Sequence, residues 1–297
     1  MGIENSKVNQ NSKKKSKQRT AVLPIECYET TLNRHIHSFT PLHWHDEVEF
    51  ILIIKGEATF QINEKEIVVK EGNGLFINSG CIHRVEKRSK LNCSYISLNV
   101  SPRFLVPEEL FKSYVYPYIQ ATHLSYLYIA SKEIWEKNII EAIRKINQII
   151  QKKSPYLEFD TVIHLRIIWK NLISNNFHLE YKQKEIIKTD RIKQMISWIH
   201  LHSEEKITLD DIARAGQLRR SECCRYFKRF LNITPLNYVI DYRIQKSLTL
   251  LQHSELNITE IAYQVGFNSP SSFIYKFRKL MKMTPLSYKN LKCVISN

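Results

Sequence analysis

Glycine is scarce in this chain, with 7 among 297 residues. The patterns GxGxxG and GxxxxGKS/T, in which glycine lets backbone amides approach a phosphate, do not occur. Long apolar runs are missing too: the run from Phe50 to Ile54 has about five residues, whereas a membrane-spanning helix needs roughly 20. The sequence therefore argues against glycine-rich nucleotide sites of these kinds and predicts no membrane partner.

Cysteine chemistry is equally limited. The six cysteines include no CxxC pair and no spacing typical of a disulfide framework. Residues 1–19 are polar and rich in lysine, and they lack the apolar segment of a secretory signal. We therefore expect reduced thiols and a cytoplasmic location.

Basic residues exceed acidic ones. Lys and Arg number 44 and Asp and Glu 29, which gives a formal net charge of +15 and a pI near 9.4. Such a surplus favours a polyanionic partner such as nucleic acid. Hydrophobic residues make up 43% of the chain, enough for a normal core, and the length suits about two domains of ~150 residues each.

The first two segments of the chain differ in pattern. Residues 1–20 predict a disordered basic arm, which either contacts phosphates or is simply a solvated tail. Residues 21–106 have a period of two, which predicts short antiparallel strands and a small β-sandwich or barrel. The predicted strands cover residues 23–29, 48–54, 57–62, 66–70, 74–78 and 93–100.

Residues 107–185 change to a period of 3.6, which is typical of amphipathic helices. One apolar stripe runs from Trp135 to Ile150 and another from Leu157 to Leu172. Either stripe could belong to a core or to a dimer interface. We interpret the segment as a helical linker that dimerises the protein.

Residues 186–297 contain an internal repeat. The run Phe227-Lys-Arg-Phe-Leu-Asn-Ile-Thr-Pro-Leu-Asn-Tyr238 returns 50 residues later as Phe277-Arg-Lys-Leu-Met-Lys-Met-Thr-Pro-Leu-Ser-Tyr288. Each copy predicts a short helix, a turn and a second helix that a Thr-Pro pair delimits. The repeated unit is a helix-turn-helix.

The turn and cap residues agree with this interpretation in the second copy. Gly266 supplies the positive φ of the turn, and Ser269 caps a helix whose first residue is Pro270. The first copy departs from this pattern, with Gln217 at the turn position and Arg219 at the cap.

Apolar side chains four residues apart should face the first helix of each motif. These are Cys223 and Phe227 in the first copy, and Phe273 and Phe277 in the second. Because free cysteine behaves as a small hydrophobe, we interpret Cys223 as a core residue. The side chains between these positions should face outward.

The repeats resemble the C-terminal domain of the AraC/XylS family of bacterial transcription regulators over about residues 190–291. The run from Ile261 to Tyr288, Ile-Ala-x3-Gly-Phe-x-Ser followed by spaced aromatic residues and Thr-Pro-x2-Tyr, is similar to the family's signature. The resemblance implies two helix-turn-helix motifs joined by a long helix, here Leu236 to about Leu251. Their recognition helices would enter adjacent major grooves about one helical turn (~34 Å) apart.

Carried over position by position, the resemblance gives six candidates for base readout: Ser221, Cys224, Arg225, Ser271, Ile274 and Tyr275. Residues 190–297 carry 17 Lys and Arg against 9 Asp and Glu, a net charge of +8. Four basic side chains suit phosphate contacts, or else form a solvated helix face: Lys228, Arg229, Lys276 and Arg278.

Four residues of metal-ligand type lie in the predicted β domain: His43, His45, Glu49 and His83. We expect the first three to lie on one strand and to share a face. Imidazoles with one carboxylate suit iron, manganese or zinc. Residues 37–87 resemble both cupin motifs, and the AraC/XylS resemblance extends to such a domain, whose pocket binds a small effector.

We therefore interpret these four residues as effector-pocket candidates and expect no metal or other cofactor. The alternative is a metal-dependent cupin enzyme with an appended DNA-binding domain. The predicted fold is α+β and multidomain: a cupin-like β-barrel, a helical middle region and an all-α C-terminal domain. The expected protein is a dimeric, non-enzymatic, sequence-specific transcription regulator of the activator type, with promoter DNA, RNA polymerase and a small effector as partners. The effector, the operator and the sign of regulation stay open.

Overall fold

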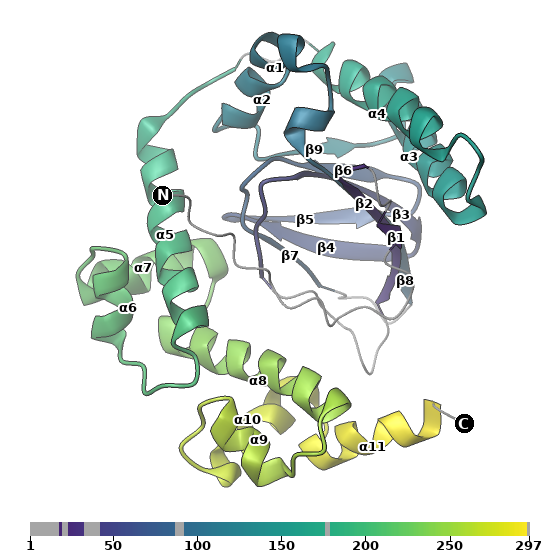
Figure 1. Ribbon diagram of the computed structural model, residues 1–297. Coiled ribbons are helices and arrows are strands. Elements are labelled where there is room, and N and C mark those ends of the chain that lie inside the picture. Colours follow the sequence, from purple (N-terminus) through teal and green to yellow (C-terminus); the bar gives the residue numbers. More distant parts are fainter. Residues whose placement is uncertain (1–17, 20–22, 33–41, 87–91, 176–178, 296–297) are drawn as a thin grey trace. The chain divides into compact units, whose positions relative to one another are not determined.

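The computed structural model describes residues 18–19, 23–32, 42–86, 92–175 and 179–295. They form two compact units, one within residues 8–183 and one within 184–297 (Figure 1). The basic arm predicted for residues 1–20 lies outside the described residues except for Gln18–Arg19, which form the short strand β1.

The first unit contains two antiparallel sheets. The larger has the strand order β1-β2-β8-β3-β6-β9 and the smaller the order β5-β4-β7. Their other strands are β2 (Ile25–Leu32), β3 (Val48–Lys55), β4 (Glu57–Ile62), β5 (Lys65–Lys70), β6 (Gly74–Ile77), β7 (His83–Glu86), β8 (Cys93–Val100) and β9 (Tyr126–Ile129). The sequence prediction missed β7 and also β9, which lies in the segment predicted to be helical.

Strand β3 lies between β8 and β6 and is buried on both faces. Phe50 and Leu52 point into one core cluster, and Ile51 and Ile53 point into another that also holds Phe60 of the smaller sheet. Alternation along β3 thus separates two layers of core, one between the sheets and one on the outer face of the larger sheet.

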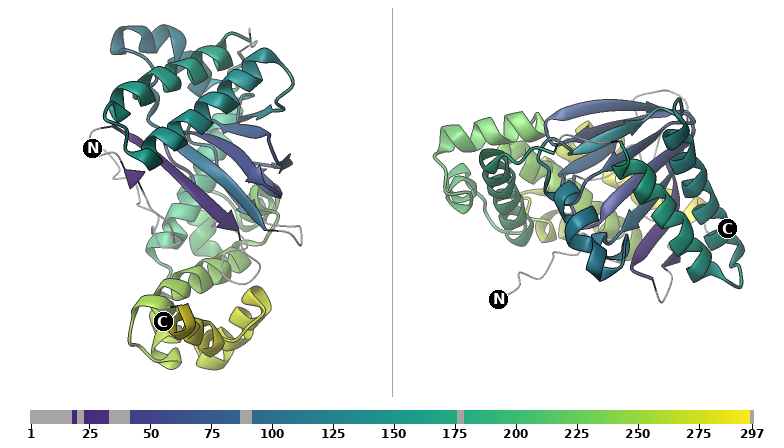
Figure 2. Two further views of the ribbon diagram at one scale, coloured as in Figure 1. Left: turned by 90° about the vertical axis from the view of Figure 1, so that its right-hand side faces the viewer. Right: turned by 90° about the horizontal axis from the view of Figure 1, so that it is seen from above.

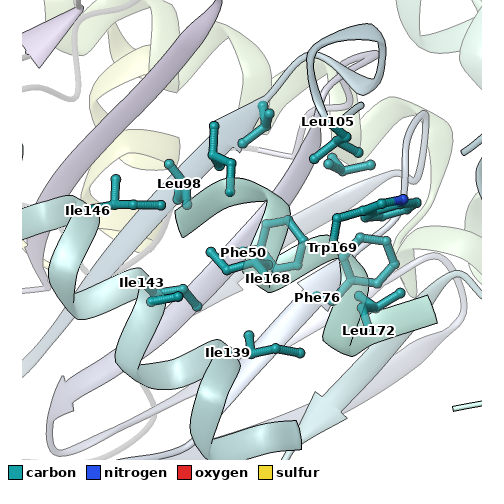
Figure 3. Close-up of a cluster of buried hydrophobic side chains, with 14 of the residues drawn as sticks. Phe50, Phe76, Leu98, Leu105, Ile139, Ile143, Ile146, Ile168, Trp169 and Leu172 are labelled. Carbon is teal, nitrogen blue, oxygen red and sulfur yellow. The ribbon is translucent and has the colours of Figure 1, made fainter. Parts of the chain in front are cut away.

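Two long helices cover that outer face, as Figure 2 shows: α3 (Ile134–Lys152) and α4 (Leu157–Ile173). The apolar side of α3, including Ile143, and that of α4, including Trp169, pack against Phe50 and Phe76 of the sheet (Figure 3). Both predicted apolar stripes therefore belong to the core. Residues 107–183 share that core with the preceding strands, and the dimerisation role assigned to the segment stays a prediction.

Short helices join the two parts of this unit: η1 (Pro102–Phe104), α1 (Glu108–Tyr114) and α2 (Tyr116–Gln120). The second unit is helical, with α5 (Gln183–Leu201), α6 (Leu209–Ala215), α7 (Arg220–Leu231), α8 (Pro235–His253), α9 (Ile258–Gln264), α10 (Pro270–Met281) and α11 (Pro285–Ile295). Within the described part of the chain, no helix is both long and apolar enough to cross a membrane.

The repeated Thr-Pro pairs begin helices in the structure. Thr234 accepts a hydrogen bond from the amide of Asn237 and precedes Pro235, the first residue of α8. Thr284 and Pro285 start α11 in the same way. Each pair therefore separates a helix-turn-helix motif from the helix that follows it.

Candidate functional site

The turns of the two helix-turn-helix motifs each contain a residue with a positive φ. Gln217, between α6 and α7, has φ = 53°, and Gly266, between α9 and α10, has φ = 94°. The first turn thus adopts the predicted positive φ although a glutamine occupies the position. Equivalent hydrogen bonds of 2.9 Å close the turns, from Leu218 N to Ala213 O and from Phe267 N to Ala262 O.

Gly266 is needed for space as well as for conformation. A Cβ atom there would collide with the carbonyl oxygen of Ser203 and lie 2.9 Å from Nε of Arg243. Arg243 itself donates from Nε to Ser203 O (2.7 Å) and from Nη2 to Glu205 O (2.5 Å). The guanidinium therefore ties α8 to the loop after α5, directly beneath the second turn.

The second helix of each motif buries the predicted apolar pairs. Cys223 and Phe227 of α7 and Phe273 and Phe277 of α10 are all fully buried. Burial raises the pKa of the Cys223 thiol to about 12, which keeps it protonated and unreactive. The interpretation of Cys223 as a core residue is confirmed.

The predicted DNA-contacting side chains lie on the outward faces of α7 and α10. Eight of the ten are exposed: Ser221, Arg225, Lys228, Arg229, Ser271, Ile274, Tyr275 and Arg278. Cys224 and Lys276 are half-buried. Their roles in DNA binding stay predictions.

Two arginines of α7 differ in how firmly they are held. Arg220 forms a bidentate ion pair with Asp210 of α6, and this pairing lowers the pKa of Asp210. Arg225 lies 3.6 Å from Glu222 and its side chain is 75% exposed. Such a long, exposed ion pair contributes little to stability, so the guanidinium of Arg225 is available to a partner. Arg220 instead connects α7 to α6.

In the first unit, His43, His45, Glu49 and His83 converge between the two sheets. Strand β3 begins at Val48, so the prediction that both histidines and Glu49 share one strand is wrong. The backbone of His43 instead pairs with that of His83 through hydrogen bonds of 3.0 and 2.9 Å. This pairing places the imidazole of His43 next to that of His83 on β7, close to the carboxylate of Glu49 on the larger sheet.

Short distances define the cluster. Nε2 of His83 lies 3.1 Å and Nε2 of His45 lies 3.8 Å from Oε2 of Glu49. One ligand atom from each of His43, His45 and His83 lies within 4.8 Å of the other two. The side chains of His83 and Glu49 are only 4% and 7% exposed.

Neighbouring groups fix the orientation of these side chains. Nδ1 of His83 donates to the carbonyl of Cys81 (2.8 Å), and Nδ1 of His45 donates to that of Glu47 (3.0 Å). Since a carbonyl can only accept, Nδ1 of each ring carries a proton, and the Nε2 atoms of both rings face Glu49.

Glu49 and the backbone of His45 are anchored by residues that the sequence analysis did not select. Ser97 Oγ donates to Oε1 of Glu49 at 2.5 Å, and the amide of Gly80 donates to His45 O at 2.8 Å. The signal for Ser97 was present in the sequence, as a small polar residue between Ile96 and Leu98 on a predicted strand.

The electrostatics of the cluster favour an ionised carboxylate. Burial alone would raise the pKa of Glu49, but the imidazoles of His45 and His83 hold it well below its ordinary value. Burial opposes protonation of His45, yet the carboxylates of Glu49 and Glu47 raise its pKa. The site therefore holds an ionised carboxylate beside imidazoles that donate to it or carry positive charge in a buried space.

Comparison with known proteins gives a family match in each of the two units. Residues 24–113 match the family described as AraC-like ligand binding domain, and residues 212–290 match the family described as helix-turn-helix domain. The chain is 58% identical to the uncharacterized HTH-type transcriptional regulator YdeC of Bacillus subtilis (strain 168), over 97% of this chain and 99% of that protein.

More distant relatives extend over most of the chain. The HTH-type transcriptional activator RhaR of Mannheimia succiniciproducens is 25% identical over 88% of this chain and 91% of its own length. The activator RhaS of Escherichia coli (strain K12 / DH10B) is 21% identical, with 82% and 86% covered. A crystal structure of apo ToxT from Vibrio cholerae strain SCE256 has a similar fold, with a TM-score of 0.50, 15% identity, and 90% and 97% of the two chains covered.

Proposed function

This chain belongs to the AraC-type family of helix-turn-helix transcriptional regulators, and from that premise we propose how its parts share the work. Helices α7 and α10 read two adjacent major-groove segments of promoter DNA. The first unit binds a small effector at the cluster of His43, His45, Glu49 and His83. The matched turns at Gln217 and Gly266, each followed by a helix with outward polar side chains, carry the DNA-binding part of this proposal. Since the relatives are named regulators, we set the enzyme alternative aside.

Within α7 we assign base readout to Arg225 and phosphate contact to Lys228. The exposed, weakly paired guanidinium of Arg225 can donate two hydrogen bonds to guanine O6 and N7, which is worth about 1–3 kcal/mol of discrimination. Lys228 lies one turn away and is also exposed. As a point charge it suits a phosphate oxygen, which carries no sequence information.

The test is selection of bound sequences from a random DNA pool by the purified full-length protein, at an ionic strength of about 0.15 M. Two sequence blocks about one helical turn apart are expected. Arg225→Ala and the charge-conserving Arg225→Lys should both relax specificity at one base pair, because only arginine has the planar fork. Lys228→Ala should weaken cognate and random DNA equally and reduce the salt slope by about one. Equal effects of Arg225→Lys on both kinds of DNA would contradict the assignment.

The effector proposal is supported by the buried polar cluster itself, in which His83 of the smaller sheet lies against Glu49 of the larger one. An effector controls transcription only if its affinity differs between two states of the protein. We expect His45→Gln to abolish the response of a reporter gene to inducing growth conditions, while DNA affinity in vitro stays unchanged. A reporter response identical to that of the wild type would contradict this role.

We further propose that the regulator is a homodimer and that α4 forms the interface. The outer face of α4 and its N-cap residue carry apolar side chains at helical spacing that are exposed: Tyr156, Phe159, Ile163 and Ile167. Tyr156 and Phe159 are 73% and 70% exposed. An apolar stripe of this kind typically marks an interface.

The charges on the same face are complementary to themselves. Asp160 lies three residues before Ile163 and Arg166 three residues after it. In an antiparallel pair of α4 helices centred on Ile163, each Asp160 therefore faces Arg166 of the other copy, as a two-fold interface requires. Asp160→Arg should weaken the dimer in analytical ultracentrifugation, and adding Arg166→Asp should restore it. Ile134→Ser, at an exposed position of α3, is the control; an unchanged dimer in Asp160→Arg would refute this interface.

Bound to its promoter, the regulator would act as an activator through contact with RNA polymerase. The names of the RhaR and RhaS relatives support this sign of regulation. Removing the gene should lower expression from promoters that contain the selected sequence, whereas raised expression would indicate a repressor.

A further inference from the structure

We propose that the two recognition helices recognise bases of different chemistry, and that α10 recognises thymine by its 5-methyl group. Ile274 and Tyr275 supply the apolar surface for this contact. Thymine recognition rests on the proposed function, since it requires that α10 enters the major groove. It adds the kind of base pair that the second half of the DNA site contains.

Equivalent positions of α7 and α10 carry different side chains. The repeat has an offset of 50 residues here, and the buried apolar pairs of the two helices obey it. At this offset Ile274 takes the place of Cys224, and Tyr275 takes that of Arg225. The guanidinium that suits guanine in α7 therefore has no counterpart at the same position of α10.

The N-terminal half of α10, residues 270–275, contains no charged residue. The exposed residues of this half are Ser271, Ser272, Ile274 and Tyr275. The corresponding half of α7 contains Arg220, Glu222 and Arg225. Because the N-terminal residues of a recognition helix contact base edges, α10 meets the bases with hydroxyl and apolar groups.

The exposed apolar side chains of α10 are complementary to one group in the major groove. Ile274 is 38% and Tyr275 is 64% exposed. Because burial of apolar surface is favourable in proportion to its area, these side chains gain free energy from an apolar partner on the DNA. Thymine presents such a partner, its 5-methyl group, whereas guanine presents hydrogen-bond acceptors there. The chemistry of α10 therefore favours A·T pairs.

The selected DNA should then be asymmetric. The sequence block read by α7 should contain guanine opposite Arg225, and the block read by α10 should contain thymine. Arg225→Lys identifies the blocks, because it should change only the one read by α7. The unchanged block is the α10 block.

The test replaces thymine by deoxyuridine, which lacks only the 5-methyl group, at each thymine of the α10 block in turn. The Kd of purified full-length protein is measured by fluorescence anisotropy at fixed ionic strength. At a contacted thymine we expect Kd to rise about fourfold, the effect of exposing one buried carbon group. In Ile274→Ala the same replacement should have almost no effect, because most of the contact surface is gone.

Two controls isolate the contact. An effect of deoxyuridine on the DNA alone would persist in Ile274→Ala, so only the difference between wild type and variant reports the side chain. Cys224→Ala, at the equivalent position of α7, should keep the full sensitivity to deoxyuridine in the α10 block. Because Ile274 is partly exposed, its truncation opens no core cavity, and circular dichroism should show the wild-type fold.

Tyr275→Phe should select the same α10 block as the wild type, since the ring and not the hydroxyl makes the contact. A changed block in Tyr275→Phe would refute this role of the ring. An α10 block without thymine, or equal sensitivity of wild type and Ile274→Ala to deoxyuridine, would overturn thymine recognition as a whole. Selection of no sequence at all would instead refute the proposed function, and thymine recognition with it.

Discussion

The buried imidazole of His200 should make the DNA-binding unit less stable in acid. His200 lies on α5, with Nε2 2.8 Å from the hydroxyl of Tyr238 and its ring stacked 4.0 Å from that of Tyr242, both on α8. Burial lowers the pKa of His200 from 6.5 to about 4. Burial also raises the pKa of both tyrosines, so neither titrates in the acid range.

The sign and size of the effect follow from this shift. The folded state holds the imidazole neutral, whereas the unfolded chain takes up a proton near pH 6.5, so the unfolded state binds more protons below that pH. Stability is therefore fully present above about pH 6.5 and falls by about 1.4 kcal/mol per pH unit until the folded pKa near 4 is reached. The total loss is about 3 kcal/mol.

The assay is hydrogen exchange measured by mass spectrometry on peptides from α5 and α8, with correction for the intrinsic rate at each pH. The free energy of opening should fall between pH 7 and pH 4.5 in the wild type. In His200→Gln, whose amide cannot titrate, it should be nearly constant over that range. His253→Gln, an exposed histidine at the end of α8, is the control. Equal slopes in wild type and His200→Gln would show that the reasoning is wrong.

Two further predictions concern stability. Gly266→Ala should lower the free energy of unfolding, measured by thermal unfolding, by about 1–3 kcal/mol, since alanine strains the positive φ and its Cβ presses on Ser203 O. Gly216→Ala should cost less, because the φ of Gly216 is negative and the new Cβ meets only the flexible side chain of Met195. Equal costs in the two variants would contradict this reasoning. Ile143→Ala should lower the free energy of unfolding in urea by about 2–5 kcal/mol, since it leaves a cavity between α3 and the sheet. Ile134→Ala, at a position that is 78% exposed, should change stability by less than about 0.5 kcal/mol. Similar losses in both variants would contradict the packing described.

Periodicity predicted the long helices and the strands whose apolar and polar side chains alternate. The alternation of Ile96, Leu98 and Val100 placed β8 correctly, and the helical stripes of α3 and α4 were correct in type and extent. Periodicity could not assign those stripes to core or interface, because an apolar face looks the same in either place. The structure shows them packed on the sheet, and it leaves a different set, with Phe159 and Ile163, on the surface.

The site residues, too, were predicted only in part from the sequence. The turn at Gln217 followed from the repeat, because the position equivalent to Gly266 could be counted along the chain. The histidine cluster was predicted with the right members and the wrong geometry. His43 joins it by backbone pairing with His83 of β7, a contact between residues far apart in the sequence that no local pattern encodes. Arg243 was not among the predicted site residues, because its hydrogen bond to Ser203 O depends on the packing of separate helices.

The length of α8 sets the spacing between the two helix-turn-helix motifs. Its 19 residues span about 28 Å at 1.5 Å per residue, and the motifs before and after it are attached at its two ends. One inserted residue would lengthen this spacer by only about 1.5 Å but would rotate everything beyond it by about 100°. Rotation about the axis of α8, more than its length, therefore limits how this helix can vary. A rotated second motif would turn its recognition helix away from the major groove next to the one that the first motif occupies.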